Sequence, residues 1–152
     1  MNIKDVKTDP YLASVGAFEI YSQCMYRADI EEYRQKIASF SAGENVYIFA
    51  AHNGSGYTGI IVLELQSSNS AEIVGIAVKK EFQRRGIGKF MIFQAAAALN
   101  LEYITAETDC DAVKFYRKSG FAVKEFIRRY PDAVVARYNC RLDILQNQKL
   151  PK

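Results

Sequence analysis

The alternation of apolar and polar positions along the chain predicts a mixture of strands and helices. A short strand is expected over residues 2–7. Asp9-Pro10 is typical of a helix start, because proline at the first helical position loses no hydrogen bond. Helices are then expected over residues 11–26 and, with Asp29 as the N-cap, over residues 30–40, where apolar residues recur at helical spacing.

The spacing then changes to that of β-strands. Residues 46–51 and 57–65 are rich in β-forming residues, and Asn53-Gly54 between them is a strong hairpin signal. Next, the chain predicts a turn at 66–70, a strand at 71–78 and an apolar helix at 84–99. A strand at 103–107 and a helix at 111–119, closed by Gly120, follow. The last two predicted strands, 121–127 and 134–142, are joined by residues 128–133. The predicted order, β-α-α-β-β-β-α-β-α-β-β, indicates a mixed α/β sheet with helices on both faces.

Composition narrows the class of protein. The 152 residues fit a single domain, residues 1–152, with 49% apolar and 24% charged residues. The net charge of +3 is too small for the dense basic surface of a nucleic-acid binder. No apolar run is long enough to span a bilayer, and the N-terminus lacks the apolar core of a signal peptide. We therefore expect a cytoplasmic protein with no nucleic-acid or membrane partner.

Cysteine and histidine are too sparse for metal or disulfide chemistry. Cys24, Cys110 and Cys140 are widely spaced and odd in number, so neither a disulfide framework nor a structural zinc site is expected. The single histidine, His52, falls in a predicted hairpin turn and is expected to be exposed. A nucleophilic role for Cys110 is disfavoured, because Asp residues on both sides oppose a thiolate.

The strongest local signal for chemistry is Gln83-Arg84-Arg85-Gly86-Ile87-Gly88-Lys89, between a predicted strand and a helix. Its glycines allow close approach of a ligand to the main chain, and the following helix offers unpaired N–H groups and the positive end of its dipole. Arg84, Arg85 and Lys89 add positive charge. The segment predicts a phosphate or pyrophosphate site; the alternative is a tight turn with solvated basic side chains.

Two other phosphate motifs are excluded. A Walker A loop needs glycine and Ser or Thr where this chain has Gln83 and Phe90. A dinucleotide fingerprint needs a third glycine after Gly86-x-Gly88, and none is present.

Two segments together resemble the GNAT (Gcn5-related) superfamily of N-acetyltransferases. Gln83-x-x-Gly86-x-Gly88 matches the family motif Q/R-x-x-G-x-G/A. The segment from Ala112 to Phe121 is similar to A-x-x-F-Y-x-x-x-G-F, about thirty residues downstream as in the family. The order of predicted elements over residues 1–143 also resembles the family topology. The resemblance implies the GNAT fold, whose central sheet is mixed, mostly antiparallel and splayed.

The resemblance also implies acetyl-CoA as cosubstrate, with no metal. The pantetheine arm of the cofactor would lie where the strands at 76–78 and 103–107 separate. There it would form hydrogen bonds with the backbone of Ile76 and Val78, as an added strand does. Pyrophosphate would rest on the amides of residues 84–89, and Phe115 would pack against the cofactor arm. The expected cofactor-binding residues are Ile76, Ala77, Val78, Gln83, Arg84, Arg85, Gly86, Ile87, Gly88, Lys89 and Phe115.

Catalytic roles follow from the same resemblance. The tyrosine of the F-Y pair, Tyr116, would protonate the departing thiolate; the alternative is a packed aromatic residue. The segment Ala71-Glu72-Ile73-Val74 is similar to that of the superfamily's histone acetyltransferases, which makes Glu72 the candidate base. Burial could raise its pKa toward neutrality. A solvated carboxylate at this position, with ordered water draining the proton instead, is the alternative. Asp109 stands where many members have asparagine, and its role is left open.

The acceptor is the least defined part. In the family its pocket lies between the first two helices and the loop joining the last two strands, here residues 11–40 and 128–133. Arg128 and Arg129 could pair with an acceptor carboxylate, or could form an exposed basic turn. The expected partners are acetyl-CoA and an amine, carried by a small molecule or a protein, and homodimers are frequent in the superfamily. The alternative function is a catalytically silent module that binds acyl-CoA.

Overall fold

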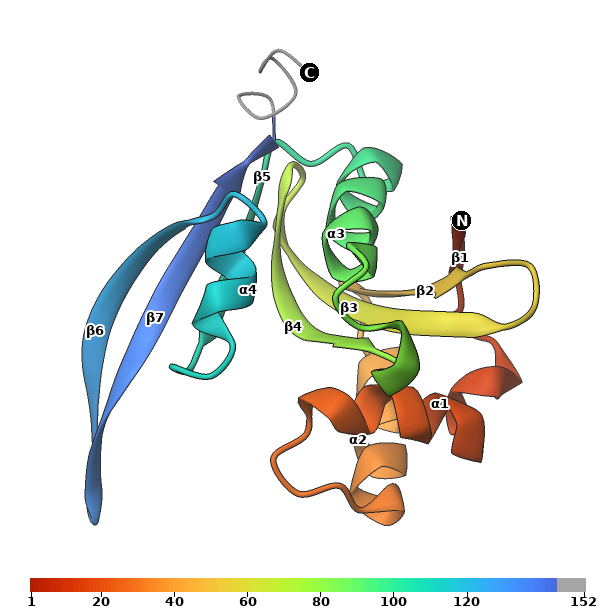
Figure 1. Cartoon of the computed structure of the whole chain (residues 1–152), viewed down its shortest axis with the longest axis horizontal. Coiled ribbons are helices and arrows are strands. Elements are labelled where there is room, and N and C mark those ends of the chain that lie inside the picture. Colours follow the sequence, from red (N-terminus) through yellow and green to blue (C-terminus); the bar gives the residue numbers. More distant parts are fainter. Residues whose placement is uncertain (145–152) are drawn as a thin grey trace.

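One seven-stranded sheet organises residues 1–144, the part of the chain that this computed structural model describes. The strands run in the spatial order β1-β2-β3-β4-β5-β7-β6 (Figure 1). Their bounds are β1 Asn2–Asp5, β2 Val46–His52, β3 Tyr57–Ser67, β4 Ser70–Val78, β5 Tyr103–Thr108, β6 Ala122–Tyr130 and β7 Ala133–Asp143. Only the β4–β5 pair is parallel; every other neighbouring pair is antiparallel. The sheet is therefore mixed and mostly antiparallel, as predicted.

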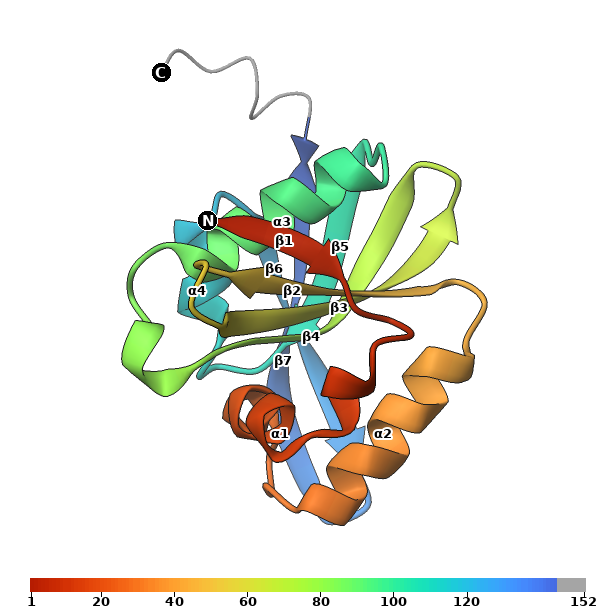
Figure 2. The same ribbon diagram turned by 90° about the vertical axis from the view of Figure 1, so that its right-hand side faces the viewer.

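Helices cover both faces of this sheet (Figure 2). One face carries α1 (Val15–Tyr21) and α2 (Ile30–Ala42), flanked by the 3-10 turns η1 (Pro10–Ala13) and η2 (Ser22–Cys24). The other carries α3 (Ile87–Ala98), preceded by the turn η3 (Lys80–Phe82), and α4 (Val113–Lys118) beside the β6–β7 hairpin. Each face has its own buried core: one gathers around Tyr21, Tyr33 and Ile60, the other around Met91, Ile104 and Leu142. The second core buries one side of α3, through Ile87, Met91, Ile92, Ala95 and Ala96, whereas the apolar Ala97 and Ala98 are exposed.

The sheet splits between β4 and β5. These strands pair only from Ser70–Tyr103 to Glu72–Thr105, and then separate. In β4 the next residues, Ile73 to Gly75, include a bulge, because Ile73 and Gly75 oppose successive residues of β3 and leave Val74 unpaired. A bulge bends its strand and increases the twist. The bulge therefore lies where β4 diverges from β5, and the predicted splay is present.

Gly75 sits at this bend because another side chain needs its space. A Cβ atom at position 75 would overlap the hydroxyl of Tyr21, which reaches across β4 from α1. Tyr21 is itself fully buried beside Tyr33. Gly75 thus lets α1 pack tightly against the bent part of β4.

Replacing Gly75 with alanine is expected to lower the free energy of unfolding by about 1–3 kcal/mol, since overpacking a closed core forces side chains and backbone to shift. Urea unfolding measures this. Gly56→Ala is the matched control: Gly56 lies in the β2–β3 turn, and an added methyl group there would have no atom within 4 Å, so its change should stay within about 0.5 kcal/mol. Equal effects of the two substitutions would contradict the packing argument.

Several predicted boundaries were wrong. Residues 11–26 form three short helical segments, because Ser14 ends the first and caps α1 by accepting the N–H of Ala17 at 3.1 Å. The helix predicted from residue 84 begins at Ile87, since Arg84 and Gly86 have left-handed backbones that a right-handed helix excludes. His52 is the half-buried last residue of β2, with its ring edge-on to Tyr57, and not an exposed turn residue.

The two predicted turns at 66–70 and 128–133 are also shorter than expected. Strand pairing continues to Ser67–Ser70 in the first hairpin and to Tyr130–Ala133 in the second. Only Pro131 and Asp132 separate β6 from β7. Polar and basic side chains on these strand ends were mistaken for loop residues, although their backbone hydrogen bonds continue the ladder.

Candidate functional site

A cavity of about 780 Å³ lies in the gap opened by the splay. Its walls come from five parts of the chain: the α1–α2 connection, the end of β4, the loop before α3, the end of β5, and α4. The lining residues are Gln23, Cys24, Met25, Tyr26, Ile76, Ala77, Val78, Phe82, Gln83, Arg84, Gly86, Ile87, Gly88, Thr108, Asp109, Asp111, Ala112, Phe115 and Tyr116. The structure thus brings both sequence motifs to one cavity.

The inner edge of β4 gives this cavity a row of backbone polar groups. Beyond Glu72, β4 pairs with β3 on one side only, so the side toward β5 is left open. Alternate residues of a strand direct their N–H and C=O groups to the same edge. The Val78 carbonyl accepts a bond from the Gln83 side chain, and the Ile76 backbone interacts with the Cys24 sulfur, so this edge faces the cavity. An extended ligand could bind here as an added strand.

The loop before α3 leads directly into the first turn of that helix, whose backbone N–H groups have no side-chain cap. Arg84 and Gly86 have φ angles of 65° and 79°, and no side chain caps the first turn of α3. Uncapped N–H groups at a helix start carry partial positive charge and bind anions. Gln83 holds the loop in place by donating to the Val78 carbonyl at 2.9 Å and to Gln23 at 3.2 Å.

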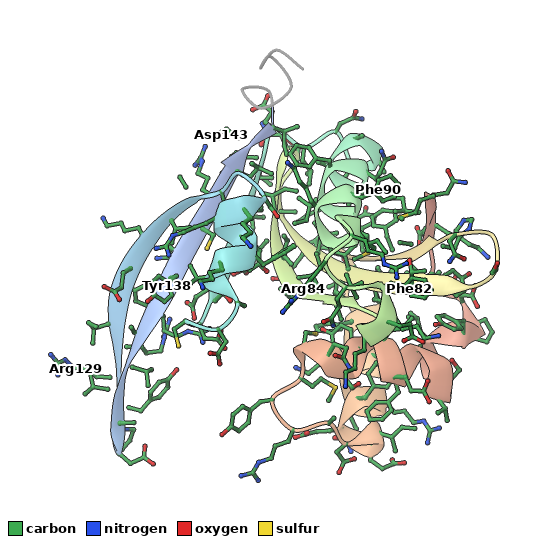
Figure 3. All side chains as sticks on the ribbon, viewed as in Figure 1. Phe82, Arg84, Phe90, Arg129, Tyr138 and Asp143 are labelled. Carbon is green, nitrogen blue, oxygen red and sulfur yellow. The ribbon has the colours of Figure 1, made fainter. Side chains whose placement is uncertain are left out.

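The basic side chains of this loop have different surroundings. Arg84 lines the cavity and is exposed (Figure 3). Arg85 lies over the ring of Phe82 at 5.5 Å, and Lys89 over the ring of Phe93 at 5.9 Å. Neither Arg85 nor Lys89 is among the lining residues. Of the predicted cofactor-binding set, these two alone lie outside the cavity wall, and their role stays a prediction.

Gly88 allows the two motifs to meet. A Cβ atom on Gly88 would lie 2.7 Å from the ring of Phe115, closer than side chains approach each other. The ring of Phe115 therefore packs directly on the first turn of α3. This contact joins α4 to the loop and places Phe115 in the cavity wall.

Tyr116 is held firmly, and its hydroxyl has no partner within the described residues. The side chain is 6% exposed, and its ring meets those of Phe115 and Phe121 edge-on, with 5.1 Å between centroids in both cases. No residue in the range 1–144 hydrogen-bonds to the hydroxyl, which belongs to a cavity-lining side chain. Burial is the main cause that raises the pKa of the Tyr116 hydroxyl. Smaller electrostatic effects of the nearby Cys140, Cys24 and Asp109 act in the same direction. The hydroxyl therefore stays protonated at neutral pH and can donate.

Asp109 has a structural role that the sequence left open. Its carboxylate accepts the backbone N–H groups of Asp111 and Ala112 at 3.0 and 2.9 Å. These bonds form the turn that leads into α4. Asp109 therefore helps to orient the helix that carries Phe115 and Tyr116.

Glu72 lies in a different cavity from Tyr116. That cavity, of about 500 Å³, is bounded by β4, β5, β6 and β7 and shares no lining residue with the first. Burial raises the pKa of Glu72, and the carboxylates of Glu64 and Glu107 raise it further. The direction matches the one expected for a base. Glu72 belongs to the last residue pair of β4 and β5, Glu72–Thr105, before the two strands separate. Glu72 and Tyr116 therefore line different cavities.

Arg128 and Arg129 do not form a joint site. Both lie in β6, where the side chains of neighbouring residues point to opposite faces of the sheet. Arg128 and Arg129 therefore cannot both bind the same carboxylate. Arg128 is paired with Glu107 at 2.8 Å, and Arg137 pairs with the same carboxylate at 3.1 Å. Arg129 points away from the rest of the molecule (Figure 3).

One wall of the cavity comes from the segment 11–40, which the resemblance assigned to the acceptor pocket without singling out individual residues. Gln23, Cys24, Met25 and Tyr26 follow α1 and close the cavity opposite α4, with Tyr26 almost fully exposed. No local pattern marks these residues. Only the packing of α1 against the bent part of β4 brings them there.

Comparison with known proteins defines the class. A family model described as the acetyltransferase (GNAT) family matches residues 12–121. The chain therefore belongs to the GNAT acetyltransferase family, and the predicted membership is confirmed. The uncharacterized N-acetyltransferase YvbK of Bacillus subtilis (strain 168) is 28% identical over 97 residues, which are 57% of this chain and 63% of that protein. The match thus spans less than two thirds of the relative's length.

Solved structures show the same fold. The ribosomal-protein-S18-alanine N-acetyltransferase from Escherichia coli superposes with a TM-score of 0.70 at 19% identity, over 94% of this chain and 93% of that one. A Bacillus subtilis acetyltransferase in complex with CoA gives 0.63 at 19% identity, over 93% and 97%. The predicted GNAT fold is therefore confirmed. None of the helices in the described part of the chain has the length and apolar character needed to cross a bilayer.

Proposed function

We propose that the chain transfers the acetyl group of acetyl-CoA directly to a primary amine of a small molecule or a protein. The observation that carries the proposal is the arrangement of three features around one cavity: the edge of β4 that no neighbouring strand covers, the uncapped start of α3 and the Tyr116 hydroxyl. These suit a pantetheine arm, a pyrophosphate and a thioester, respectively. The CoA complex of a structural relative supports the choice of cofactor.

Each step of the transfer has a candidate group. Backbone N–H groups on the edge of β4 that contains Ile76 can polarise the thioester carbonyl. The neutral amine attacks that carbon, the carbon–sulfur bond breaks, and Tyr116 gives its proton to the departing thiolate. The attacking nitrogen releases one proton through water to the base as the amide forms, and the Tyr116 oxygen takes up a proton from solvent. The raised pKa of Tyr116 keeps this proton in place until the thiolate forms. Direct transfer needs no covalent intermediate on the enzyme.

Titration calorimetry with CoA, followed by an assay of thiol release from acetyl-CoA with a panel of amines, tests the proposal. We expect heat with CoA, none with ATP or NAD, and thiol release with at least one amine. CoA binding without turnover on any amine would favour the silent acyl-CoA-binding module instead. Absence of heat with CoA would refute the proposed site.

Glu72 is the proposed base, acting on the acceptor amine through water, because it lies outside the cavity that holds Tyr116. A base must be deprotonated, so turnover should fall as the pH drops through the raised pKa of Glu72. In Glu72→Gln this acidic limb should disappear and the maximal rate should fall by about 10²-fold or more. A pH–rate profile of both proteins measures this. An unchanged acidic limb would assign the base to solvent.

A further inference from the structure

The cavity contains a thiol that the proposed transfer does not use. Cys24 closes the short turn η2 and lines the cavity wall together with Ile76 and Tyr116. Its sulfur donates to the Tyr21 carbonyl at 3.3 Å. It also interacts with the backbone of Ile76 and with the side chains of Tyr21 and Tyr116. Cys24 therefore lies close to both groups that we assign to the thioester carbonyl and the leaving sulfur.

This end of the cavity is suited to polar ligand atoms. Tyr116 is more than nine-tenths buried, since only 6% of it is exposed, yet its hydroxyl faces the cavity without a partner in residues 1–144. The hydroxyl oxygen is open to the cavity and can therefore donate a hydrogen bond to a ligand atom there. The ligand atom that we place there is the sulfur of CoA. That sulfur would then lie beside the thiol of Cys24.

Cys24 reacts through the small thiolate fraction of its side chain. Although the residue is exposed, the surrounding protein desolvates the thiol and raises its pKa, and hydrogen bonds with the Tyr21 side chain and the Ile76 backbone oppose this rise. The thiol is therefore largely neutral at physiological pH, and its exchange with a disulfide becomes faster as the pH rises.

We propose that Cys24 is a modification site for oxidised coenzyme A, forming a mixed disulfide with one CoA moiety held in the cavity. The proposal rests on the proposed function, because the cavity must bind the ADP and pantetheine parts of CoA. The reactant is CoA disulfide, the symmetrical disulfide of two CoA molecules. The adduct fills the cofactor site and blocks acetyl-CoA.

The chemistry is thiol–disulfide exchange and balances without a further oxidant. Cys24 releases its proton to solvent, and the thiolate attacks the CoA disulfide sulfur that lies in the cavity. The bond between the two CoA sulfurs breaks, and a bond forms between Cys24 and one of them. The other CoA leaves as a thiolate and takes up a proton from solvent. One disulfide is consumed and one is formed.

Non-covalent binding should give Cys24 an advantage over the other exposed thiol. Cys110 is also exposed, but it is absent from the cavity wall. Binding of the cofactor arm raises the effective concentration of the disulfide at Cys24 to the order of millimolar. Glutathione disulfide lacks that arm, so it should react without this advantage.

The test is incubation of the full chain with micromolar CoA disulfide, followed by intact-mass measurement and peptide mapping. We expect one CoA adduct, located on Cys24, forming at least about tenfold faster than the adduct with glutathione disulfide at equal concentration. Cys24→Ser should abolish it, Cys110→Ser should retain it, and excess CoA thioether analogue, which cannot exchange, should suppress it. Dithiothreitol should remove the adduct.

Several results would overturn the inference. Equal modification of Cys24 and Cys110, or equal rates with the two disulfides, would show that the cavity does not direct the reaction. If calorimetry shows that CoA binds and no Cys24 adduct forms, the modification site is wrong and the proposed function stands. If CoA does not bind at all, both fail. Thermal unfolding of Cys24→Ser and Cys24→Ala confirms that loss of the adduct reflects the thiol and not the fold.

Discussion

A Tyr116→Phe variant is expected to lose turnover by about 10²–10⁴-fold, the range for removal of a positioned acid. CoA binding should weaken by no more than about tenfold, because one neutral hydrogen bond to the CoA sulfur contributes about 0.5–1.5 kcal/mol. The substitution keeps the ring, which packs edge-on against Phe115 and Phe121, and removes only the hydroxyl. The departing thiolate then has to take its proton from solvent. Steady-state rates of thiol release and calorimetry with CoA measure the two parts separately.

Tyr138→Phe provides the control for this change. Tyr138 lies on β7, outside both cavities, and its hydroxyl bonds to Glu125 at 3.2 Å on the surface. Removing that hydroxyl should leave turnover within about twofold, as expected for a surface substitution. If Tyr116→Phe kept the parent rate, Tyr116 would be a packing residue, and the proton would come from elsewhere.

Gly86→Ala is expected to weaken CoA binding by about 10- to 100-fold, since one charge-assisted hydrogen bond to a ligand contributes about 1.5–3 kcal/mol. Gly86 has a φ of 79° and precedes the first turn of α3, so its backbone sets the direction of the amides that we assign to the pyrophosphate. Alanine resists this conformation at a cost of about 1–2 kcal/mol. Calorimetric titration with CoA measures the change in Kd.

Gly54→Ala separates backbone strain from binding. Gly54 also has a positive φ, 91°, and like Gly86 has no atom within 4 Å of an added methyl group, but it lies in the β2–β3 turn. Both substitutions should lower the free energy of unfolding by similar amounts, while only Gly86→Ala should raise the Kd for CoA. Parallel calorimetry and urea unfolding test this. A similar loss of CoA affinity in both variants would attribute the effect to general destabilisation.

Local patterns in the chain were sufficient for the elements and the family. The β2–β3 hairpin at Asn53-Gly54, the helix capped by Asp29 and the apolar α3 lie where spacing and turn residues indicate. The Gln83–Gly88 motif and the Phe115-Tyr116 pair identified the family, because close backbone approach to a ligand requires glycine at particular positions. The helix start predicted at residue 84 was wrong because of positive φ angles at Arg84 and Gly86, which the residue type at position 84 does not reveal. The turns predicted at 66–70 and 128–133 were too long because strand pairing continues into them.

Relations between distant segments needed the folded chain. The parting of β4 from β5 after Glu72–Thr105 depends on a bulge in the pairing with β3, and pairing registers are not encoded in either strand alone. The placement of Cys24 beside Tyr116 follows from α1 packing over Gly75, which is far from both residues in the sequence. The resemblance gave Glu72 and Tyr116 roles in one reaction, whereas in the folded chain the two side chains line different cavities. Sequence motifs record what each backbone segment requires locally, whereas a cavity is formed by side chains that only long-range packing brings together.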